Sequence, residues 1–596
     1  MSPISVIRKQ SNLISFILSA LATLCLGYAI KDSGEWFTYS NSFIMIPVLI
    51  GGFLSIKSFW YIERRTKISS LIVGFFFAAS QVFGKNLLLY DRSECKNIKV
   101  WLAILFLTPL FASLIGHLFA LIDRRTSITS YKMSPYKVFF LSWALIFVLW
   151  LPVLFAAYPG VYGYDCVYQI NYCKAEMINL KHPIAHSLML YFFVIKLGDQ
   201  VFHDKEFGYF LYSILQMLIL SGSMAYSIKY LIRKGTPRWF LVTVLALFAL
   251  LPVNPIMGMS STKDVLYAAF GLVYTVLLLE ILEAQKISKL KVVLMSIALL
   301  LTMTFRSQGF YVFLAMVPVV LFLLKGKRVK TLILAIVITI VYLLYSGPFT
   351  TKVLHGIKYD YSKQEYFSVP CMQLMRVFHN EEGALSTEQA QKIASYIPNY
   401  EYDGAHGVAD PYKNGMDVTS ISEDPMEFAK LWWDVGVNNT VDYIDAWGRL
   451  TIGLWYSDMN YWDIGSWHYY WEYDMVRENP EVFDILERRT PPALQGMSDL
   501  YREWSNENTY QKIPLVPLLV SSGVYFWCIV IFEVWCVIKR KYQYLIVAAY
   551  PVIYWLTMLL GPVVLYRYVY ILALIIPIMF GVMITATSDK QRASEG

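Results

Sequence analysis

The sequence predicts an all-α membrane protein that crosses the bilayer many times. Hydrophobic residues make up 57% of the 596 residues and charged residues only 16%, whereas soluble domains average about 25% charged residues. Apolar runs recur along the chain, many of them near the length of about 20 residues that a helix needs to cross a membrane. The net charge of +8 comes largely from basic residues in short loops, so it indicates membrane orientation and no nucleic-acid partner.

The apolar runs predict about fourteen transmembrane helices. The first run, LISFILSALATLCLGYAI, resembles a signal peptide, but further runs follow it, so we interpret it as a retained anchor. A polar, aromatic segment (348–512) separates the last three runs from the others. The predicted spans lie near residues 12–30, 41–60, 69–84, 101–122, 138–157, 207–231, 239–256, 265–282, 292–305, 309–324, 331–347, 513–538, 542–560 and 566–584.

The segment 184–202 decides the orientation of every later loop. Only the residues SLMLYFFVI separate His186 from Lys196, which is too few for a crossing. If the segment lies on the membrane surface as an amphipathic helix, IRKGTPR, KGKRVK, KRK and most other basic loops are cytoplasmic. The basic loop KNLLLYDRSECKNIK is the exception. We therefore predict an external juxtamembrane helix at 184–202, cytoplasmic termini and an external segment 348–512.

The external segment 348–512 is predicted to be a mostly α-helical ectodomain. Ser386 and Gln389 form a capping-box pattern in LSTEQAQKIASYI, and Asp424 precedes Pro425 at the start of a second helix. Eight of the 17 tryptophans lie in this segment. Such a density suits either stacking on sugar rings or anchoring at the level of the lipid headgroups.

These features divide the chain into four regions. Residues 1–137 form an N-terminal extension of four transmembrane helices, and residues 138–347 form a transmembrane module that contains the outer loop and the juxtamembrane helix. Residues 348–512 form the ectodomain. Residues 513–596 form a C-terminal region with three transmembrane helices.

Ionisable residues gather at the outer ends of the predicted spans. Asp165 follows the fifth span in an aromatic loop, YPGVYGYDCVYQINYCK, and Lys263 and Asp264 open the eighth span. Arg306 ends the ninth span, and Arg567 opens the fourteenth. Ionisable residues at membrane depth usually face a bundle interior or an aqueous cavity. Two carboxylates and several cations favour chemistry on a phosphate-linked substrate, because a carboxylate accepts a proton while cations stabilise a leaving phosphate.

Each of these residues also has a purely structural interpretation. Asp165 would then be a solvated loop residue, and Lys263 with Asp264 would form a helix cap and an interfacial anchor. Arg306 and Arg567 would extend towards the lipid headgroups. The sequence alone leaves both interpretations open.

Metal ligands are weakly indicated. His182 and His186 lie four residues apart, but a proline follows the first and no third ligand is near, so we interpret them as hydrogen-bond donors to substrate or supports of the Asp165 loop rather than zinc ligands. The loop EYDGAHGVADPYKNG lacks the spacing of an EF-hand and is interpreted as a surface turn. Cys166 and Cys173 share the aromatic loop and could pair, although packing or free thiols are favoured.

The order of these features resembles the front half of GT-C glycosyltransferases, a family that includes aminoarabinose transferases and protein O-mannosyltransferases. The shared features are an apolar span, the aromatic loop with Asp165, a proline-led interfacial helix (HPIAHSLMLYFFVIKLG), two spans with a short basic turn, and Asp264 at the next outer loop. The resemblance covers residues 138–347 well and 513–584 loosely. The ending GPVVLYRYVYILALIIP also resembles a bacterial branch of GT-C-like proteins without assigned activity.

The resemblance implies substrates and residue roles. GT-C enzymes use polyprenyl- or dolichyl-phosphate sugars and act at the outer face of the membrane. Asp165 corresponds to the usual catalytic base and Asp264 to the second acid, while Lys263, Arg306 and Arg567 are candidates for holding the lipid phosphate. The chain departs from the family in its four extra N-terminal spans. It also lacks the adjacent acidic pair of some members, because a cysteine follows Asp165, so a divalent metal is not favoured.

The predicted function is the inverting transfer of a sugar from a polyprenyl-phosphate donor to a glycan, lipid or protein acceptor of the cell envelope. Asp165 and Asp264 are the predicted catalytic residues. The predicted substrate-binding residues are Tyr164, Gln169, His182, His186, Lys263, Arg306, Arg567 and Tyr568. The alternatives are a transporter or flippase of lipid-linked glycans, an O-antigen polymerase or ligase type of enzyme, and a non-catalytic scaffold. Few cysteines and a lone Asn-Asn-Thr sequence favour a bacterial plasma membrane.

Overall fold

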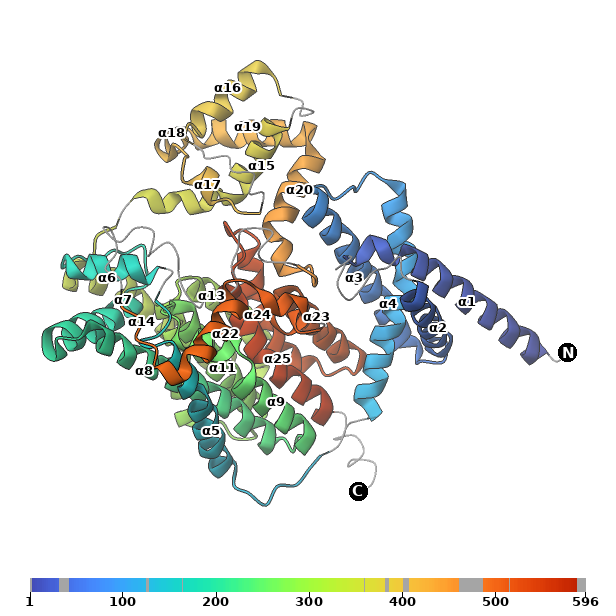
Figure 1. Cartoon of the computed structure of the whole chain (residues 1–596), viewed down its shortest axis with the longest axis horizontal. Coiled ribbons are helices and arrows are strands. Elements are labelled where there is room, and N and C mark those ends of the chain that lie inside the picture. The colour runs from blue at the N-terminus through green and yellow to red at the C-terminus, as the bar shows by residue number, and fades with distance from the viewer. Residues whose placement is uncertain are drawn as a thin grey trace.

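The computed structural model describes residues 3–31, 42–124, 128–162, 165–358, 360–380, 385–399, 407–459, 486–513 and 515–586, and the structure below is that of these residues. They are helical almost throughout (Figure 1). No β-strand occurs among them, and two isolated bridges join Val161 to Ser260 and Asn179 to Ile357. The predicted all-α class is therefore confirmed over the described part of the chain.

A helix lies at each predicted span. These helices are α1 (Pro3–Ala29), α2 (Ser42–Phe59), α3 (Arg64–Tyr90), α4 (Ile98–Arg124), α5 (Pro135–Ala156), α8 (Lys205–Arg233), α9 (Arg238–Leu250) with α10 (Val253–Met259), α11 (Lys263–Leu282), α12 (Lys289–Phe305), α13 (Gln308–Leu323), α14 (Arg328–Leu344), α23 (Ser522–Ile538), α24 (Leu545–Met558) and α25 (Tyr566–Ala586). Eight helices of the described chain are long and apolar enough to cross a membrane, or nine if the bent pair α9–α10 is one span. The protein is thus a multi-pass membrane protein by composition, and fourteen crossings stay a prediction.

The first four helices form a bundle of their own beside the remaining membrane helices (Figure 1). Leu26, Ala78 and Ile104 lie in its separate hydrophobic core. The bundle meets the rest of the protein where α3 packs against α23 and η5 (Ile452–Leu454). Gly84 of α3 lies directly against the ring of Tyr456, and a side chain at this glycine would occupy the space of that ring.

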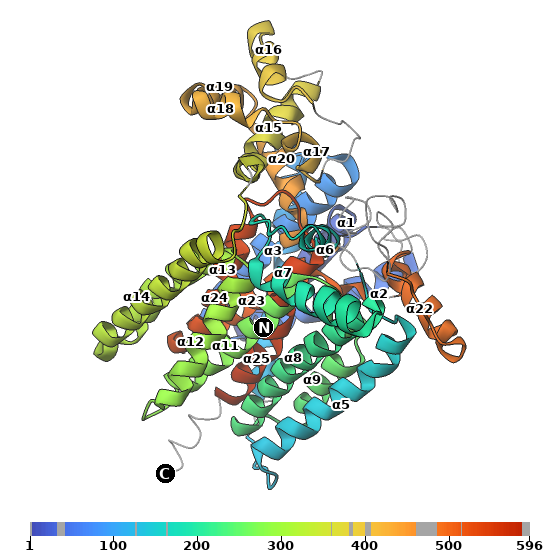
Figure 2. The same ribbon diagram turned by 90° about the vertical axis from the view of Figure 1, so that its left-hand side faces the viewer.

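The centre of the membrane part is built around α11 and α25. In both helices 83% of the apolar window is inside the protein, and they pack against α8, α23 and α24. Large aromatic side chains such as Trp150, Tyr267 and Trp535 fill this core. Helix α14, by contrast, stands at the edge of the molecule (Figure 2), and only 11% of the window that it shares with the following π-helix η3 (Tyr345–Val353) is buried.

A short helix (α7, Ile184–Leu190) continues into a π-helix (η1, Tyr191–Phe202) at the position of the predicted juxtamembrane helix. One side of it is buried against α8, where Gly198 and Gly208 approach each other closely, while Phe192 is half exposed. The pair is not among the helices long and apolar enough to cross a membrane. Its placement on the outer leaflet stays a prediction.

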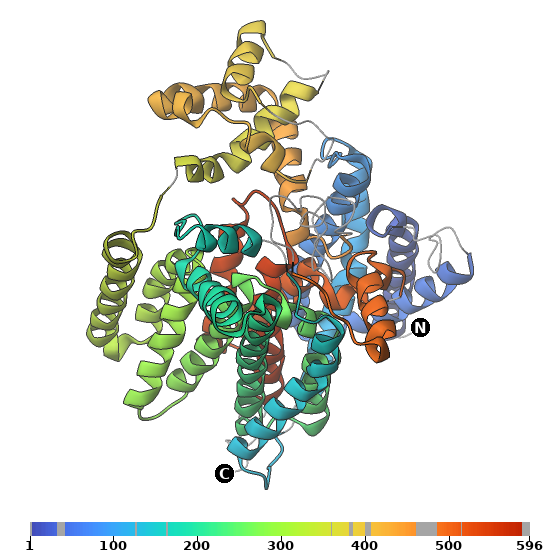
Figure 3. The same ribbon diagram turned by 60° about the vertical axis from the view of Figure 1, so that its left-hand side comes forward.

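A small helical domain lies at one end of the membrane helices (Figure 3). It contains η4 (Asp360–Phe367), α15 (Ser368–His379), α16 (Thr387–Tyr396), α17 (Asp410–Lys413), α18 (Val418–Glu423), α19 (Pro425–Asn438) and α20 (Thr440–Thr451). Both helix starts predicted from sequence are confirmed: the reciprocal capping box of Ser386 and Gln389 is present, and the Asp424 side chain accepts from the backbone N–H of Glu427. Leu374, Ile393 and Val435 belong to its own core.

This domain is shorter than the predicted ectodomain 348–512. Residues 452–459 and 486–512 return to the membrane helices, where Leu454 joins the central core, and α22 (Gln495–Ser505) packs against α5. Thr490 Oγ1 donates to the Ala156 carbonyl at 2.8 Å. The separate domain therefore covers about 360–451. Sequence polarity does not separate the two parts, because tryptophans and charged residues occur in both.

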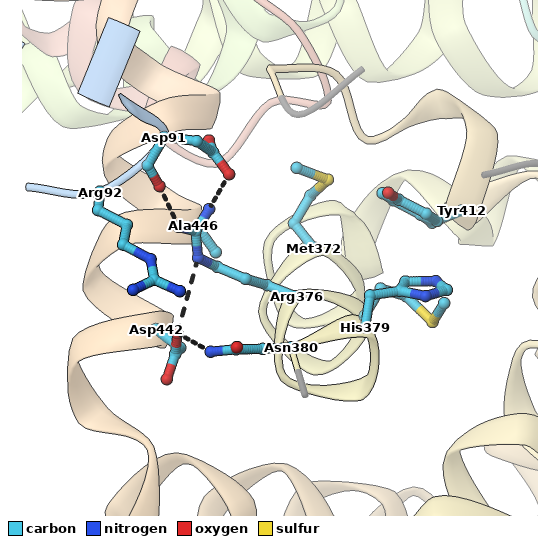
Figure 4. A pocket seen from close by; sticks show the side chains of 10 residues that line it. Asp91, Arg92, Met372, Arg376, His379, Asn380, Tyr412, Asp442 and Ala446 are labelled. Atoms are coloured by element: carbon cyan, nitrogen blue, oxygen red, sulfur yellow. Dashed lines mark hydrogen bonds and ion pairs between the residues drawn. The ribbon is translucent and has the colours of Figure 1, made fainter. Parts of the chain in front are cut away.

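Arg376 joins this domain to the N-terminal bundle. Its guanidinium lies between Asp91, which follows α3, and Asp442 of α20, and it contacts the carboxylate and the carbonyl of Asp91 (Figure 4). Asn380 also donates to Asp442 at 3.0 Å. Arg449 adds a second contact to Asp91 at 3.5 Å. Polar pairing thus contributes to this contact, which surrounds a cavity of about 160 Å³.

Candidate active site

Two chain segments lie side by side and position the candidate site. Residues 158–162, which follow α5, run along residues 259–261, which precede α11: the N–H of Val161 donates to the Met259 carbonyl at 3.2 Å, and the N–H of Ser261 donates to the Val161 carbonyl at 3.1 Å. Gly160 has a φ of +141° and lies so near α8 that a Cβ would be 2.9 Å from the Tyr209 ring. Only glycine fits this approach. The contact brings Asp165 and Lys263 to the same place.

Asp165 is surrounded by basic groups. Its Oδ2 lies 2.5 Å from Lys263 Nζ, 3.6 Å from the Arg567 guanidinium and 4.0 Å from His182 Nδ1. The side chain is 32% exposed, so a substrate can reach the carboxylate. Asp165 is also the N-cap residue of α6 (Cys166–Lys174), but its side chain makes no capping hydrogen bond. The carboxylate is therefore directed to the cations rather than to the helix.

Asp264 lies deeper in the same cluster, with 1% of its side chain exposed. It pairs with Arg306, which starts the turn between α12 and α13, and with Arg567 at 3.5 Å. Thr262 donates its hydroxyl to Asp264 Oδ2 at 2.8 Å and caps α11. The buried carboxylate is therefore paired with two guanidinium groups. Arg567 thus bridges the two acidic residues.

Tyr568 stacks on both arginines. The guanidinium carbons of Arg306 and Arg567 lie 4.2 Å and 4.9 Å from its ring centroid. Arg567 also donates to the Tyr568 hydroxyl at 3.2 Å, and Arg306 Nε donates to Gln308 at 2.5 Å. Cation–π contacts of this kind fix the planes of the guanidinium groups. The arginines are held in place before any substrate arrives.

A buried hydrogen-bond chain supports the cluster from behind. His186, with 1% exposure, contacts Gln169 of α6 at 2.8 Å and the Tyr212 hydroxyl of α8 at 2.9 Å. Tyr212 donates to Gln216 at 2.8 Å, and Gln216 donates to the carbonyls of Gly258 and Ser260. The chain connects the helix that begins at Asp165 with the turn before Lys263. It therefore fixes the spacing of the two residues.

The charges shift the protonation equilibria of the site. Enclosure by protein raises the pKa of the Asp165 carboxyl, but the charges of Lys263 and Arg567 lower it more, so its pKa lies well below the ordinary value. Burial and the charge of Lys263 lower the pKa of His182 to about 4. At neutral pH Asp165 is therefore ionised and His182 is neutral.

His186 makes the stability of the protein sensitive to acid. Burial and Lys263 lower its pKa to about 3, below the ordinary value, so the folded state resists protonation. We expect the free energy of unfolding to fall as the pH drops below about 6.5, by up to about 1.4 kcal/mol per pH unit. His186→Gln removes the group that takes up a proton on unfolding. We therefore expect this variant to flatten the dependence of the free energy of unfolding on pH between about pH 6.5 and 4, as measured by denaturant unfolding of the reconstituted protein.

The exposed His355 provides the control for this measurement. His355→Gln is expected to leave the pH profile unchanged. Identical slopes for wild type and His186→Gln would contradict the buried, neutral state of His186.

The structure brings together Asp165, His182, Lys263, Asp264, Arg306, Arg567 and Tyr568 in one cluster. Gln169 and His186 lie in the supporting chain, with protein groups on both ring nitrogens of His186, and Tyr164 lies outside the described residues. Sequence analysis missed Tyr212, Gln216 and Thr262. For Tyr212 and Gln216, the one feature of the sequence that pointed to a role was the recurrence of polar residues along α8.

The side chains also bear on metal binding and on disulfide formation. In the described ranges no three His, Cys, Asp or Glu residues lie close enough to hold a metal ion. Most of the loop EYDGAHGVADPYKNG lies outside these ranges. Cys166 and Cys173 form no disulfide, and Cys166 Sγ lies 2.7 Å from Ser261 Oγ. Both cysteines are buried in one hydrophobic cluster, so the packing that the sequence analysis favoured over a disulfide is confirmed.

Comparisons with known proteins give one result. No curated protein and no solved structure is significantly similar to the chain. One family model matches residues 174–596, a stretch that contains Lys263, Arg306 and Arg567 but begins after Asp165. Because the match covers more than half of the chain, the protein belongs to DUF6020, a family of unknown function.

Proposed function

We propose that the protein is a glycosyltransferase that moves a sugar from a polyprenyl-phosphate donor to an acceptor of the cell envelope. The observation that carries the proposal is the convergence of Asp165, Lys263, Asp264, Arg306 and Arg567. They come from four places in the chain and meet at the ends of membrane helices. A purely structural use of Asp165 does not account for a carboxylate that is one-third exposed and faces two cations.

The net charge of the cluster suits an anionic donor. Lys263, Arg306 and Arg567 contribute three positive charges and Asp165 with Asp264 two negative charges, which leaves a net charge of +1 with His182 neutral. Because Asp264 already neutralises Arg306, the groups most available to a phosphate are Lys263 and Arg567. Cations fixed in this way stabilise the charge that develops on a leaving phosphate.

Donor binding is proposed to activate the base. With Lys263 at 2.5 Å, Asp165 has a low pKa and is a weak proton acceptor. A donor phosphate competes for Lys263 and Arg567 and thereby raises the basicity of Asp165. The acceptor hydroxyl then loses its proton to Asp165 while its oxygen attacks the anomeric carbon. The bond from that carbon to the phosphate oxygen breaks, the electron pair leaves with the phosphate, and the sugar configuration is inverted.

A cavity next to His182 suits the phosphate end of the donor. It has a volume of about 160 Å³ and lies between α7, α12, α14 and η3. Its polar lining includes Thr304 and Ser307 near Arg306, and its apolar lining includes Met303 and Tyr342. In this proposal the lipid chain extends along the largely exposed helix α14. The reaction takes place at the outer face of a bacterial plasma membrane, with both termini of the chain in the cytoplasm.

One observation favours a flippase as the second candidate. Helices α9 and α10 meet at a bend of 51°, and broken helices are typical of transporter binding sites. The break is closed by protein groups, however: Asn254 donates to the Leu247 carbonyl at 2.9 Å and accepts from the Tyr570 hydroxyl at 2.8 Å. Because the polar groups at the bend are hydrogen-bonded within the protein, we interpret α9 and α10 as a rigid support for the turn before Lys263.

The proposal is tested by mass-spectrometric profiling of envelope glycans and glycolipids. A strain without the gene is compared with the same strain that expresses the protein. The expected result is a sugar substituent that disappears in the deletion strain and returns with the gene, together with accumulation of the sugar-loaded lipid phosphate. Loss of the substituent with accumulation of the donor on the inner leaflet alone would favour the flippase, and unchanged glycans would contradict both candidates.

A further inference from the structure

A second cavity lies beside the Asp165 loop. Its volume is about 380 Å³, which is within the range of small-molecule sites. It is enclosed by α6, η1, the start of α8 and the segment 486–489. Neither the catalytic cluster nor the supporting hydrogen-bond chain occupies it.

The cavity and the catalytic cluster share one structural element. Tyr162 precedes Asp165 by three residues, and Ile170 lies in α6, the helix that Asp165 begins; both line the cavity. A molecule in the cavity therefore lies beside the loop and the helix that hold Asp165. The cavity beside His182 is a separate one and shares no lining residue with it.

The lining of the cavity is polar and balanced in charge. The charged side chains are Lys174, Asp199, Asp204, Lys205, Glu206 and Arg489, which sum to zero. Tyr162 presents an aromatic ring beside them. A site for phosphate or a uronic acid would carry a net positive charge, whereas a neutral sugar uses mixed donors and acceptors for its hydroxyls and an aromatic ring for its C–H face. The balance therefore favours a neutral polyhydroxyl ligand.

Ion pairs hold the walls of the cavity, while a carboxylate at its rim is available to a ligand. Arg489 pairs with Asp204 at 3.3 Å and with Glu206 at 3.6 Å, and its N–H donates to the Tyr158 carbonyl at 3.1 Å. Asp199, on the exposed side of η1, makes no hydrogen bond or ion pair within the described chain. The Asp199 carboxylate can therefore accept hydrogen bonds from two neighbouring hydroxyls of a sugar. The ion pairs of Arg489 need not change when the sugar binds.

We infer that this cavity binds a neutral sugar unit of the acceptor glycan and presents the adjoining hydroxyl to Asp165. The inference rests on the proposed function, because it assigns the acceptor side of the same site. It also names the acceptor class, a neutral glycan chain rather than a protein or an acidic polymer. Asp199 accepts hydrogen bonds from the sugar hydroxyls and thereby determines which hydroxyl of the glycan faces Asp165.

The test uses the full-length protein in phospholipid nanodiscs, prepared without alkyl glycoside detergents because these would compete for the cavity. The probes are neutral methyl disaccharides with gluco, galacto and manno configurations, a uronic-acid disaccharide and inorganic phosphate, observed by saturation-transfer NMR. We expect at least one neutral probe to bind. Asp199→Ala weakens that binding at least fivefold, and Asp434→Ala, at an exposed aspartate of α19, leaves it unchanged.

Each result separates the inference from the proposed function. Binding of none of the neutral probes, preferred binding of the uronic acid or phosphate, or equal binding by Asp199→Ala would overturn the neutral-sugar site. If neutral probes bind through Asp199 but envelope glycans are unaffected by the gene, the site stands and the transferase proposal fails. If glycans depend on the gene but Asp199→Ala binds normally, only the acceptor assignment is wrong.

Discussion

Asp165→Asn is expected to reduce sugar transfer by about 10²- to 10⁴-fold, the usual contribution of general base catalysis. Asparagine has nearly the same shape as aspartate but cannot accept the proton of the acceptor hydroxyl. Transfer is measured as the rate of product formation by the reconstituted protein once profiling has identified the donor, and in cells by the return of the missing glycan. The matched control is Asp434→Asn, at an exposed position on α19.

Donor affinity separates a catalytic from a structural role of Asp165. In the wild type, Lys263 and Arg567 are engaged by Asp165 at 2.5 Å and 3.6 Å. Without that charge they bind the donor phosphate with less competition, so Asp165→Asn should bind the donor at least as tightly while turnover is lost. A variant that transfers sugar at the wild-type rate would refute the assignment of the base, and one that loses donor binding together with activity would show a structural role.

Asp264→Asn is expected to destabilise the protein by about 3–5 kcal/mol, the typical cost of removing one partner from a buried ion pair. Asp264 is 1% exposed, and Arg306 and Arg567 are 9% and 8% exposed at their side chains. Loss of the carboxylate therefore leaves two enclosed guanidinium groups without their shared counter-charge. Unfolding of the reconstituted protein in increasing denaturant provides the measurement.

The double variant Asp264→Asn/Arg306→Gln supplies the control for this effect. It removes a positive charge together with the negative one, while Arg567 keeps Asp165 as a partner. We expect it to recover about 1–3 kcal/mol relative to the sum of the single variants. Additive losses would mean that the pair of Asp264 and Arg306 does not hold the cluster together.

The arrangement of the acidic and basic residues was predictable because membrane topology limits where they can lie. With segment 184–202 on the membrane surface, the predicted outer ends of the spans carry Asp165, Lys263, Arg306 and Arg567. The structure brings these residues together in one cluster. Helix caps such as Ser386 depend on neighbouring residues only and were equally readable.

Contacts between distant polar residues were not predictable. Gln216 and Tyr212 look like ordinary helix residues in the sequence, and their role depends on the close approach of α8 to the turn before α11. The boundary of the helical domain at residue 451 was missed for a related reason. Tertiary packing, rather than local polarity, decides whether a tryptophan-rich segment joins a domain or returns to the membrane helices.

The helical domain is attached to the membrane helices through several side chains. Trp447 of α20 donates to the Leu559 carbonyl at 3.0 Å and Arg449 donates to the Leu88 carbonyl at 3.3 Å, while Arg376 contacts Asp91, which follows α3. Turning the domain about α20 would break contacts that Arg376 and Trp447 make with two different parts of the membrane helices. We therefore expect the domain to keep one orientation relative to those helices.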